Sequence, residues 1–318
     1  MRKTLLILFL SSFIILSSLS GCKLSMLQIG VSTYPVEYLV KRIAKDKVNV
    51  VMLSEGTIIS RVTAIADFKT AIDKLDVFFQ MGQLEPFIST HVEDIQKSNV
   101  KVVDLVGTSA VYAFKRYTNS VIGNQVISVT SPYYDGTEFS TIDMYETDPY
   151  LWLDPITMTS MASTIKKWLI SAYPEEKAYF DANYSDLEVE LANMDANYQP
   201  IRSKDISIVT ITPAFGNWQK AYGVKVYPVI LSRYGALPNA AQLALIKAKI
   251  KSENVQYIVK DPLMTEDMLV LYETLKADLG LDEISLHSLA FLSADDTENK
   301  RDYMTIMYDN LDVLKSID

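Results

Sequence analysis

The sequence predicts an α/β protein made of two parallel-sheet lobes bridged by one long rigid helix. Three observations lead to this expectation. The chain has 318 residues, which is enough for about two domains. Short apolar segments alternate with helix-like segments in two separate blocks, as in parallel sheets that helices cover on both faces. Between the blocks lies a long run of good helix formers without Gly or Pro.

The first block alternates strands and helices. Its helices carry apolar residues at helical spacing, as in V-E-Y-L-V-K-R-I-A at 36–44. We expect strands at 26–31, 48–53, 77–79 and 100–105, and helices at 36–44, 64–75 and 85–98. The following segment, 117–147, is rich in Ser, Thr, Tyr, Asn and Gly, and it contains Tyr117, Tyr133, Tyr134 and Tyr145 but no His. We expect a long surface loop there, of the kind that often carries function.

Helical sequence resumes after Pro155, and the run at 175–198 predicts a single helix of roughly 36 Å, at 1.5 Å per residue. The second block then repeats the alternation. We expect strands at 206–211, 225–230, 255–259 and 284–286, and helices at 215–222, 239–253, 265–279 and 303–317. This organisation divides the chain into an N-terminal lobe at 22–155, helices including the bridging helix at 156–198, and a C-terminal lobe at 199–318.

Composition excludes several classes of function. Hydrophobic residues make up 49% and charged residues 22%, so the chain can bury a sizeable core. Lys and Arg number 30 against 39 Asp and Glu, and this acidic balance without a basic run argues against a nucleic-acid partner. With only one Cys and two His, the chain has no Cys-based zinc site and no internal disulfide.

The first 22 residues predict where the protein works. Arg2 and Lys3 precede an apolar stretch at 5–16 that has the length of a signal peptide. The sequence L-S-G-C at 19–22 resembles the lipobox of bacterial lipoproteins. We therefore expect a signal peptide at 1–21 and a lipidated Cys22 that anchors an extracytoplasmic protein to the cell membrane. An ordinary secretory signal with an unrelated cysteine is the alternative, but the one Cys of the chain lies at the lipobox position.

Nothing in the sequence indicates an enzyme. The motifs G-x-S-x-G, the Walker loop and H-E-x-x-H are absent from the sequence. The acidic pairs Asp282–Glu283 and Asp295–Asp296 lie in exposed-looking runs without catalytic spacing. An extracytoplasmic location also disfavours chemistry that needs cytosolic nucleotide cofactors.

Five stretches of the chain resemble motifs of the zinc/manganese solute-binding lipoproteins of bacterial ABC importers, over nearly the whole mature chain. They are V-S-T-Y-P at 31–35, L-E-P-F at 84–87, D-P-Y-L-W-L-D-P at 148–155, T-P-A-F-G-N-W at 212–218, and D-Y-M at 302–304 with Met307, Asn310 and Leu311. The resemblance implies two α/β lobes with a ligand cleft between them. It also implies that the protein captures a solute, a metal ion in that family, and delivers it to an ABC permease.

The ligand positions of the family hold different side chains in this chain. The family binds its metal with four side chains, typically His, His, His or Glu, and Asp. The aligned positions here are Ser60, Tyr150, Thr212 and His287. Only His287 is a strong ligand type for zinc. The resemblance implies zinc or manganese as the bound ion, whereas the sequence itself requires no cofactor.

Several interpretations of these positions stay open. Tyr150 is a wall of the cleft, a contact to an organic solute, or a phenolate ligand to a hard ion such as Fe³⁺. His287 is either structural or part of the cleft, and we expect Trp152 and Trp218 to be core residues first. The alternatives to a metal receptor are therefore a receptor for a non-metal or ferric ligand, and a surface adhesin or scaffold without a small ligand. A receptor predicts a pocket between the lobes that contains Tyr150 and His287, whereas a scaffold predicts that side chains fill it.

Overall fold

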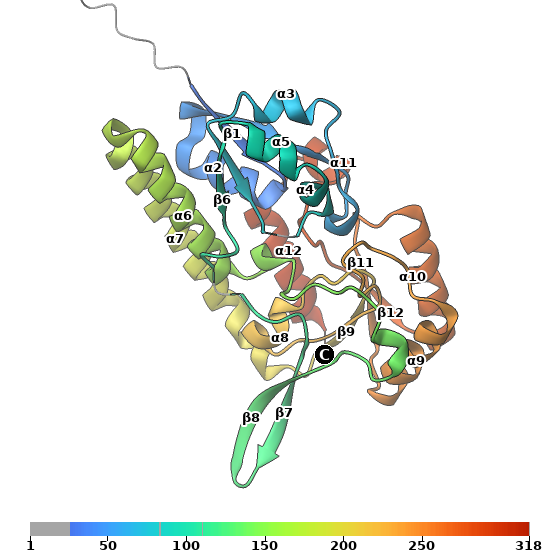
Figure 1. Cartoon of the computed structure of the whole chain (residues 1–318). Helices are drawn as coiled ribbons and strands as arrows, with labels where there is room; N and C mark the ends of the chain where they lie inside the picture. The colour runs from blue at the N-terminus through green and yellow to red at the C-terminus, as the bar shows by residue number, and fades with distance from the viewer. Residues whose placement is uncertain (1–25, 83, 110, 318) are drawn as a thin grey trace, which may run out of the picture.

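The computed structural model describes residues 26–82, 84–109 and 111–317, and in these ranges it contains two four-stranded parallel sheets, one in each lobe (Figure 1). The first sheet has the strand order β2-β1-β5-β6, and the second has the order β10-β9-β11-β12. The strands of the first sheet are β1 (Leu27–Val31), β2 (Val48–Met52), β5 (Val77–Gln80) and β6 (Lys101–Asp104). Those of the second are β9 (Ser207–Thr210), β10 (Lys225–Pro228), β11 (Tyr257–Lys260) and β12 (Asp282–Ser285). The predicted fold class is confirmed.

Helices connect the parallel strands, because a parallel pair needs a crossover that returns the chain to the same edge. In the N-terminal lobe they are α2 (Tyr34–Ala44), α3 (Phe68–Ile72), α4 (Pro86–Thr90) and α5 (Val92–Lys97). In the C-terminal lobe they are α8 (Asn217–Tyr222), α9 (Ala240–Ser252), α10 (Glu266–Leu279), α11 (Ala294–Glu298) and α12 (Tyr303–Ser316). Short 3₁₀ turns supplement them: η1 (Lys45–Lys47), η2 (Ile59–Arg61), η3 (Thr137–Phe139), η4 (Leu151–Leu153), η5 (Pro174–Glu176) and η6 (Gln199–Ser203).

Two helices of the first lobe differ from the sequence expectation. The helix expected at 64–75 is shortened to α3, because β4 (Thr63–Ala64) pairs with β3 (Ser54–Glu55) in a small antiparallel ladder. The helix expected at 85–98 is divided into α4 and α5 at His91. The ring of His91 packs against Phe68, with 4.5 Å between the ring centroids. His91 therefore connects the break between α4 and α5 to the start of α3.

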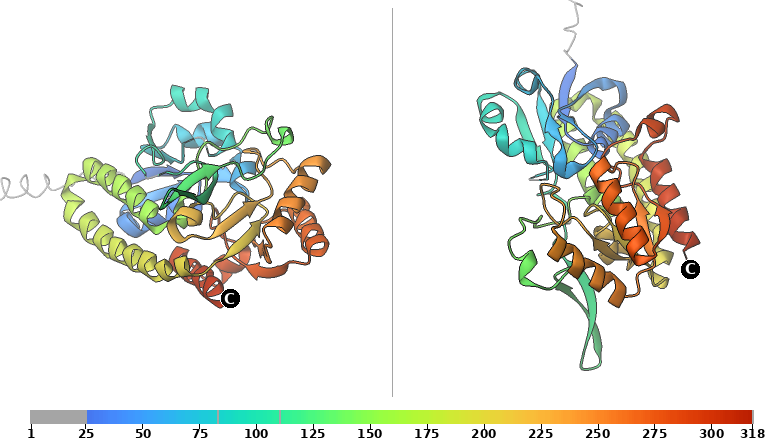
Figure 2. Two further views of the ribbon diagram at one scale, coloured as in Figure 1. Left: turned by 90° about the horizontal axis from the view of Figure 1, so that it is seen from below. Right: turned by 90° about the vertical axis from the view of Figure 1, so that its right-hand side faces the viewer.

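The helix pair α6 (Pro155–Ala172) and α7 (Lys177–Tyr198) runs along one side of the molecule beside both lobes (Figures 1 and 2). Near its start, α7 donates a hydrogen bond from Asn183 Nδ2 to the carbonyl of Ile43, at 2.9 Å. At its end, the hydroxyl of Tyr198 donates to the carbonyl of Met307 in α12, at 2.6 Å. The predicted bridging helix is therefore confirmed, and it contacts both lobes by side-chain hydrogen bonds as well as by packing.

The prediction of a surface loop at 117–147 is wrong for the first half of this segment. That half forms an antiparallel hairpin, β7 (Arg116–Ile122) and β8 (Gln125–Ser131), which projects from the body in Figure 1 and in the right-hand view of Figure 2. The physical reason is a turn signal, Gly123-Asn124, between two segments of strand-forming residues. Gly123 has a positive φ of 61°, which the tight turn requires.

Trp152 and Trp218 are fully buried core residues, as predicted. Among the described residues, no helix combines the length and apolarity that a membrane crossing requires. The predicted signal peptide at 1–21 and Cys22 lie outside the described residues. The exact division of the chain at 155 and 198 stays a prediction.

Candidate functional site

Loops that follow the strands of both sheets meet between the two lobes. The backbone amide of Tyr34, after β1, donates to the carbonyl of Ala290, which lies beyond β12, at 3.0 Å. The hydroxyl of Tyr145 donates to the carbonyl of Leu84 at 3.3 Å. Ligands of parallel α/β proteins bind outside the carboxyl ends of the strands, so this junction is where a candidate site belongs.

All four positions that sequence comparison selected are buried near this junction. Ser60 lies in η2, Tyr150 precedes η4, Thr212 follows β9, and His287 follows β12. The side-chain hydroxyl of Thr212 lies beside the phenol of Tyr150. Burial raises the pKa of Tyr150 well above its ordinary value of 10, so the side chain stays a neutral phenol.

Ser60 contacts a loop of the other lobe. A methyl group built on Gly235 would lie 2.8 Å from Ser60 Oγ, so the two segments are in close contact. The next residue, Arg61, donates from Nε and Nη2 to the carbonyl of Gly235, at 3.1 Å and 2.6 Å. Ser60 is thereby placed at a closed contact between the lobes.

His287 uses both of its ring nitrogens within the protein. The amide of Leu289 donates to Nδ1 at 2.8 Å, so Nδ1 has no proton. The proton therefore lies on Nε2, which donates to Asp296 Oδ2 at 2.9 Å. In this arrangement the imidazole has no lone pair left for a metal ion. The backbone of His287 also exchanges two hydrogen bonds with the side chain of Asn310, at 2.8 Å and 2.9 Å.

Three buried carboxyl groups lie around the junction, and each has one oxygen without a hydrogen-bond partner among the described residues: Glu85 Oε2, Asp148 Oδ2 and Asp261 Oδ2. Burial raises the pKa of Glu85 to about 7 and that of Asp148 to about 7. It also raises the pKa of Asp261. Sequence reasoning included Glu85 and Asp148 only as parts of motifs, and it missed Asp261. The available signal was an acidic residue directly after a buried strand, at the carboxyl end where ligands bind.

The residues present do not form a zinc site of the usual kind. Zinc takes four ligands from imidazole, thiolate and carboxylate groups in a tetrahedron. Among the described residues, no group of three or more His, Cys, Asp or Glu could hold a metal ion. The two aligned hydroxyl residues, Ser60 and Thr212, are weak neutral donors for zinc.

The pocket expected from the sequence is only partly matched. A cavity of about 510 Å³ is lined by His287 and Asp261, but its lining does not include Tyr150, which is fully buried. A smaller cavity of about 270 Å³ lies between the lobes and is lined by Asp104 of the first lobe and by Glu146 and Arg233. The structure therefore brings Tyr150 and Thr212 together, places Ser60 at the interlobe contact, and turns His287 toward a separate cavity.

Comparison with known proteins extends this description. Residues 29–317 match the profile of a family described as zinc-uptake complex component A, periplasmic. The chain is 28% identical over 170 residues to the high-affinity zinc uptake system protein ZnuA of Bacillus subtilis. This alignment covers 53% of this chain and 52% of that protein. It is 25% identical over 293 residues to the zinc-binding lipoprotein AdcA of Streptococcus pneumoniae. This second alignment covers 91% of this chain and 55% of AdcA. The chain thus spans about half the length of the curated relatives it matches.

Solved structures agree on the fold. The Zn(II)-bound ZnuA-like domain of Streptococcus pneumoniae AdcA superposes with a TM-score of 0.67 at 25% identity, covering 92% of this chain and 98% of that one. The periplasmic zinc-binding protein TroA of Treponema pallidum gives a TM-score of 0.71 at 18% identity, covering 91% and 98%. The second likeness concerns the fold alone.

Proposed function

Because this chain belongs to the family of periplasmic A components of zinc-uptake complexes, we propose that it is an extracytoplasmic solute-binding receptor that delivers its cargo to an ABC permease. The observation that carries the proposal is the family match over residues 29–317, which includes both lobes and the bridging helices. The meeting of strand-end loops from both sheets supports it, since this is where a two-lobed receptor holds its cargo. The match does not favour an adhesin or scaffold, and we propose no catalytic role.

The cargo of the family is a metal ion, and AdcA of Streptococcus pneumoniae is named as zinc-binding. In this chain the aligned set is Ser60, Tyr150, Thr212 and a His287 that already binds Asp296. We therefore propose that the wild-type protein binds zinc weakly for this family. Elemental analysis and native mass spectrometry of the protein purified from its host would detect a metal ion or an organic cargo directly. A stoichiometric zinc content would contradict the weak-binding proposal.

The first prediction concerns zinc and thermal stability. A ligand at 100-fold excess over its Kd stabilises a protein by about 2.7 kcal/mol, which corresponds to a Tm rise of very roughly 5–10 °C. For the wild type we expect a much smaller rise with zinc or manganese, measured by differential scanning calorimetry. The triple variant Ser60→His, Tyr150→His, Thr212→His should gain a zinc-dependent rise because it restores three imidazole ligands.

A matched control for packing is Ser60→Asn, Tyr150→Phe, Thr212→Val, which changes the same positions without adding imidazoles. It should show no zinc-dependent rise. A large rise in the wild type would mean that at least one metal ligand has been assigned to the wrong residue. The assignment to Ser60 would be the first to revise. A triple histidine variant that folds but does not respond to zinc would contradict the alignment.

The second prediction concerns the anchor. We propose that residues 1–21 are a signal peptide and that a lipid on Cys22 anchors the mature protein to the membrane. Cys22→Ser should release the protein from the membrane fraction or leave an uncleaved precursor, as measured by cell fractionation and intact mass. The conservative control Ser25→Ala, outside the lipobox-like sequence, should fractionate as the wild type does. Unchanged processing and membrane association of Cys22→Ser would refute lipidation at this residue.

A further inference from the structure

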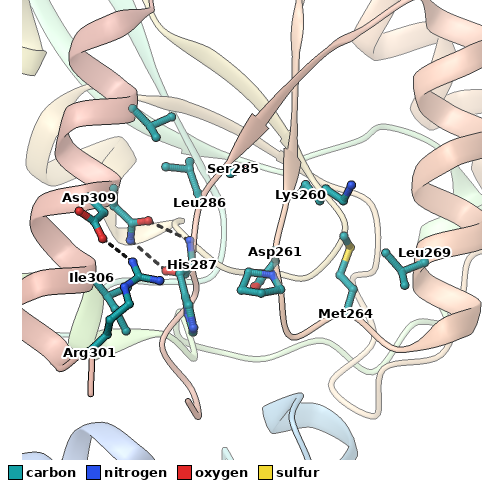
Figure 3. Close-up of a pocket in the computed structure, with 13 residues that line it drawn as sticks. Lys260, Asp261, Met264, Leu269, Ser285, Leu286, His287, Arg301, Ile306 and Asp309 are labelled. Carbon is teal, nitrogen blue, oxygen red and sulfur yellow. Dashed lines mark hydrogen bonds and ion pairs between the residues drawn. The ribbon is translucent and has the colours of Figure 1, made fainter. Parts of the chain in front are cut away.

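The C-terminal lobe contains a cavity at the free edge of its sheet that neither the family motifs nor the proposed import role explains. β12 is the last strand of this sheet, so one of its edges has no neighbouring strand among the described residues. The cavity has a volume of about 510 Å³, and Ser285 at the end of β12 lines it together with the next two residues, Leu286 and His287. Figure 3 shows α10 and α12 on opposite sides of this strand end.

The hydrogen bonds of β12 show which of its main-chain groups face the free edge. In a parallel pair, alternate residues of a strand bond to the neighbouring strand. The amide of Asp282 donates to the carbonyl of Gln256 at 2.8 Å, so Asp282 and Ile284 point to β11. The N–H and C=O groups of Glu283 and Ser285 therefore point to the free edge. Outside the ladder, no hydrogen bond joins the main chain of Ser285 to another described residue.

His287, two residues further along, shows what partner a main-chain group takes here. The side-chain amide of Asn310 in α12 accepts from the N–H of His287 at 2.8 Å and donates to its C=O at 2.9 Å. Asn310 thus supplies the donor and the acceptor that the peptide group of a neighbouring strand would supply. At Ser285, which is exposed and lines the cavity, the same two positions are open.

The two helices give the cavity apolar walls. In Figure 3, Met264 and Leu269 lie on the side of α10, and Ile306 lies on the side of α12. Val313 of α12 extends the second wall. Successive side chains of an extended chain point to opposite faces, so a strand added to β12 would direct its side chains alternately toward the two walls. Apolar side chains fit there, because their burial removes apolar area from water.

The charged groups of the lining favour a neutral ligand. Arg301 binds the carboxylate of Asp309, and Lys260 lies 3.4 Å from a carboxylate oxygen of Glu283. Asp261 is buried, with 4% of the residue exposed. A ligand ion would have to compete for side chains that the protein already pairs or buries, whereas an uncharged amide needs only the open main-chain groups.

We propose that this cavity binds a short extended peptide, whose backbone adds to the free edge of β12 and whose apolar side chains pack against the two walls. An amide of the peptide donates to the C=O of Ser285, and a carbonyl of the peptide accepts from its N–H. In strand addition the main chain provides affinity and pockets for alternate side chains provide specificity. The volume lies within the range of ligand sites, which is roughly 300–1,000 Å³. The proposal does not depend on which cargo the importer carries.

The probe is the neutral peptide N-acetyl-Val-Leu-Val methylamide, titrated into the isotope-labelled mature chain and followed by two-dimensional NMR. We expect shifts of the amide signals of cavity residues. The same peptide with all its amide nitrogens methylated has no donor and should bind at least about tenfold more weakly. Absence of shifts up to millimolar concentration overturns the proposal, and so does equal binding of the methylated peptide.

The source of the peptide is distinguished by its ends. The tripeptide Val-Leu-Val with a free amino group and a free carboxylate represents a free oligopeptide, whereas the capped probe represents a segment within a longer chain. Equal binding of both supports a free oligopeptide as the ligand. Binding of the capped probe alone supports a segment of a longer chain.

Hydrogen exchange tests the open edge itself. In the free protein, the amide of Ser285 should exchange quickly with solvent, whereas the amide of Ile284, which belongs to the ladder, should exchange slowly. Saturation with the capped peptide should slow the exchange of the Ser285 amide at least about tenfold. If this amide is protected as strongly as that of Ile284 in the free protein, the edge is covered and the proposal is overturned.

Two variants locate the site, each with a matched control. Ser285→Pro removes the outward N–H, a change that edge strands tolerate, and should weaken peptide binding at least about tenfold. Val102→Pro makes the same change in β6, an edge strand of the other sheet in which the amide of Lys101 points inward, and should bind as the wild type does. Leu269→Trp should block the cavity, whereas Leu245→Trp on α9, with the same exposure of 37%, should not. If Ser285→Pro does not fold, Leu269→Trp decides: unchanged binding in Leu269→Trp, or in a folded Ser285→Pro, overturns the assignment.

Discussion

Glu85 and Asp148 couple the stability of the lobe interface to pH, because each is a buried carboxyl group that forms no ion pair with another described residue. The hydroxyl of Ser32 donates to Glu85 Oε1, and the amide of Tyr150 donates to Asp148 Oδ1 at 2.8 Å. These hydrogen bonds do not offset desolvation, which raises the pKa of each group to about 7. Both groups therefore keep a proton in the folded protein at pH values where the unfolded chain has lost it.

The third prediction follows from this difference. Between the ordinary carboxyl pKa of about 4 and the folded value of about 7, the folded state binds more protons than the unfolded state. The free energy of unfolding should therefore fall as pH rises through this window and level off above it. Each group contributes at most on the order of 3–4 kcal/mol. Denaturant unfolding at pH 5 and pH 8 measures the fall.

Glu85→Gln and Asp148→Asn should each reduce this fall, because the amides do not ionise. The control Asp282→Asn, an exposed carboxylate, should leave the pH dependence unchanged. If both buried variants keep the wild-type fall between pH 5 and pH 8, then the two carboxyl groups are ionised in the folded protein and burial does not raise their pKa.

Single residues also show where sequence reasoning ends. The burial of Trp152 and Trp218 was predictable because they lie in motifs with a known packing role. The engagement of His287 was not, because its partner Asp296 belongs to the capping box of α11, where Ser293 is the N-cap. A contact between a strand-end residue and a helix-start residue depends on the path of the loop between them. No local periodicity encodes that path.

At the level of elements, periodicity predicted the parallel strands and most helices, since each buries an apolar face. It failed at the β7–β8 hairpin, which contributes little to the core. There the informative pattern was the turn Gly123-Asn124, and the polar composition around it concealed the strands. A segment whose apolar residues face solvent gives no amphipathic signal of burial, so loop and exposed hairpin are hard to distinguish from composition.

The fourth prediction concerns this hairpin. Val121 and Val126 pair across the strands near the turn and are 72% and 67% exposed. Val121→Thr with Val126→Thr should change the free energy of unfolding by no more than about 0.5 kcal/mol, because neither side chain is buried. Val226→Thr in β10, where the side chain is fully buried, should cost on the order of 1–3 kcal/mol for an unpaired hydroxyl. Urea unfolding measures both, and a large loss in the hairpin variant would show that its tip is covered.

At the level of the whole molecule, the lobes are joined by more than the bridging helices. Arg61 of the first lobe binds three groups of the second. In addition to the carbonyl of Gly235, its Nη1 lies 3.1 Å from Thr265 Oγ1 and 2.9 Å from Asp267 Oδ1. Arg61 lowers the pKa of Asp267 to about 2, so this ion pair persists throughout the neutral range. The lobes are thus held together by contacts that belong to the protein itself.

The last prediction is that Arg61 limits the separation of the lobes. Spin labels on cysteines at Lys69 in α3 and Val270 in α10, in a Cys22→Ser background, would report the interlobe distance. Arg61→Ala should lengthen or broaden that distance distribution, and Arg61→Lys should give an intermediate result, because an ammonium cannot reproduce the planar fork of donors. Arg202→Ala is the matched control, since Arg202 also binds backbone carbonyls but only within the second lobe.

The size of the change is limited by the helix pair α6 and α7, which packs against both lobes. Large hinge closures occur where flexible loops connect the lobes. Here a continuous helix bonded to Ile43 at one end and to Met307 at the other resists such bending. Cargo binding should therefore leave the small-angle scattering profile of the wild type nearly unchanged, whereas Arg61→Ala should show only a modest opening. An unaltered label distance in Arg61→Ala would mean that the helix pair alone fixes the relative position of the lobes. A marked compaction of the wild type on binding its cargo would mean that the helix pair does not fix that position.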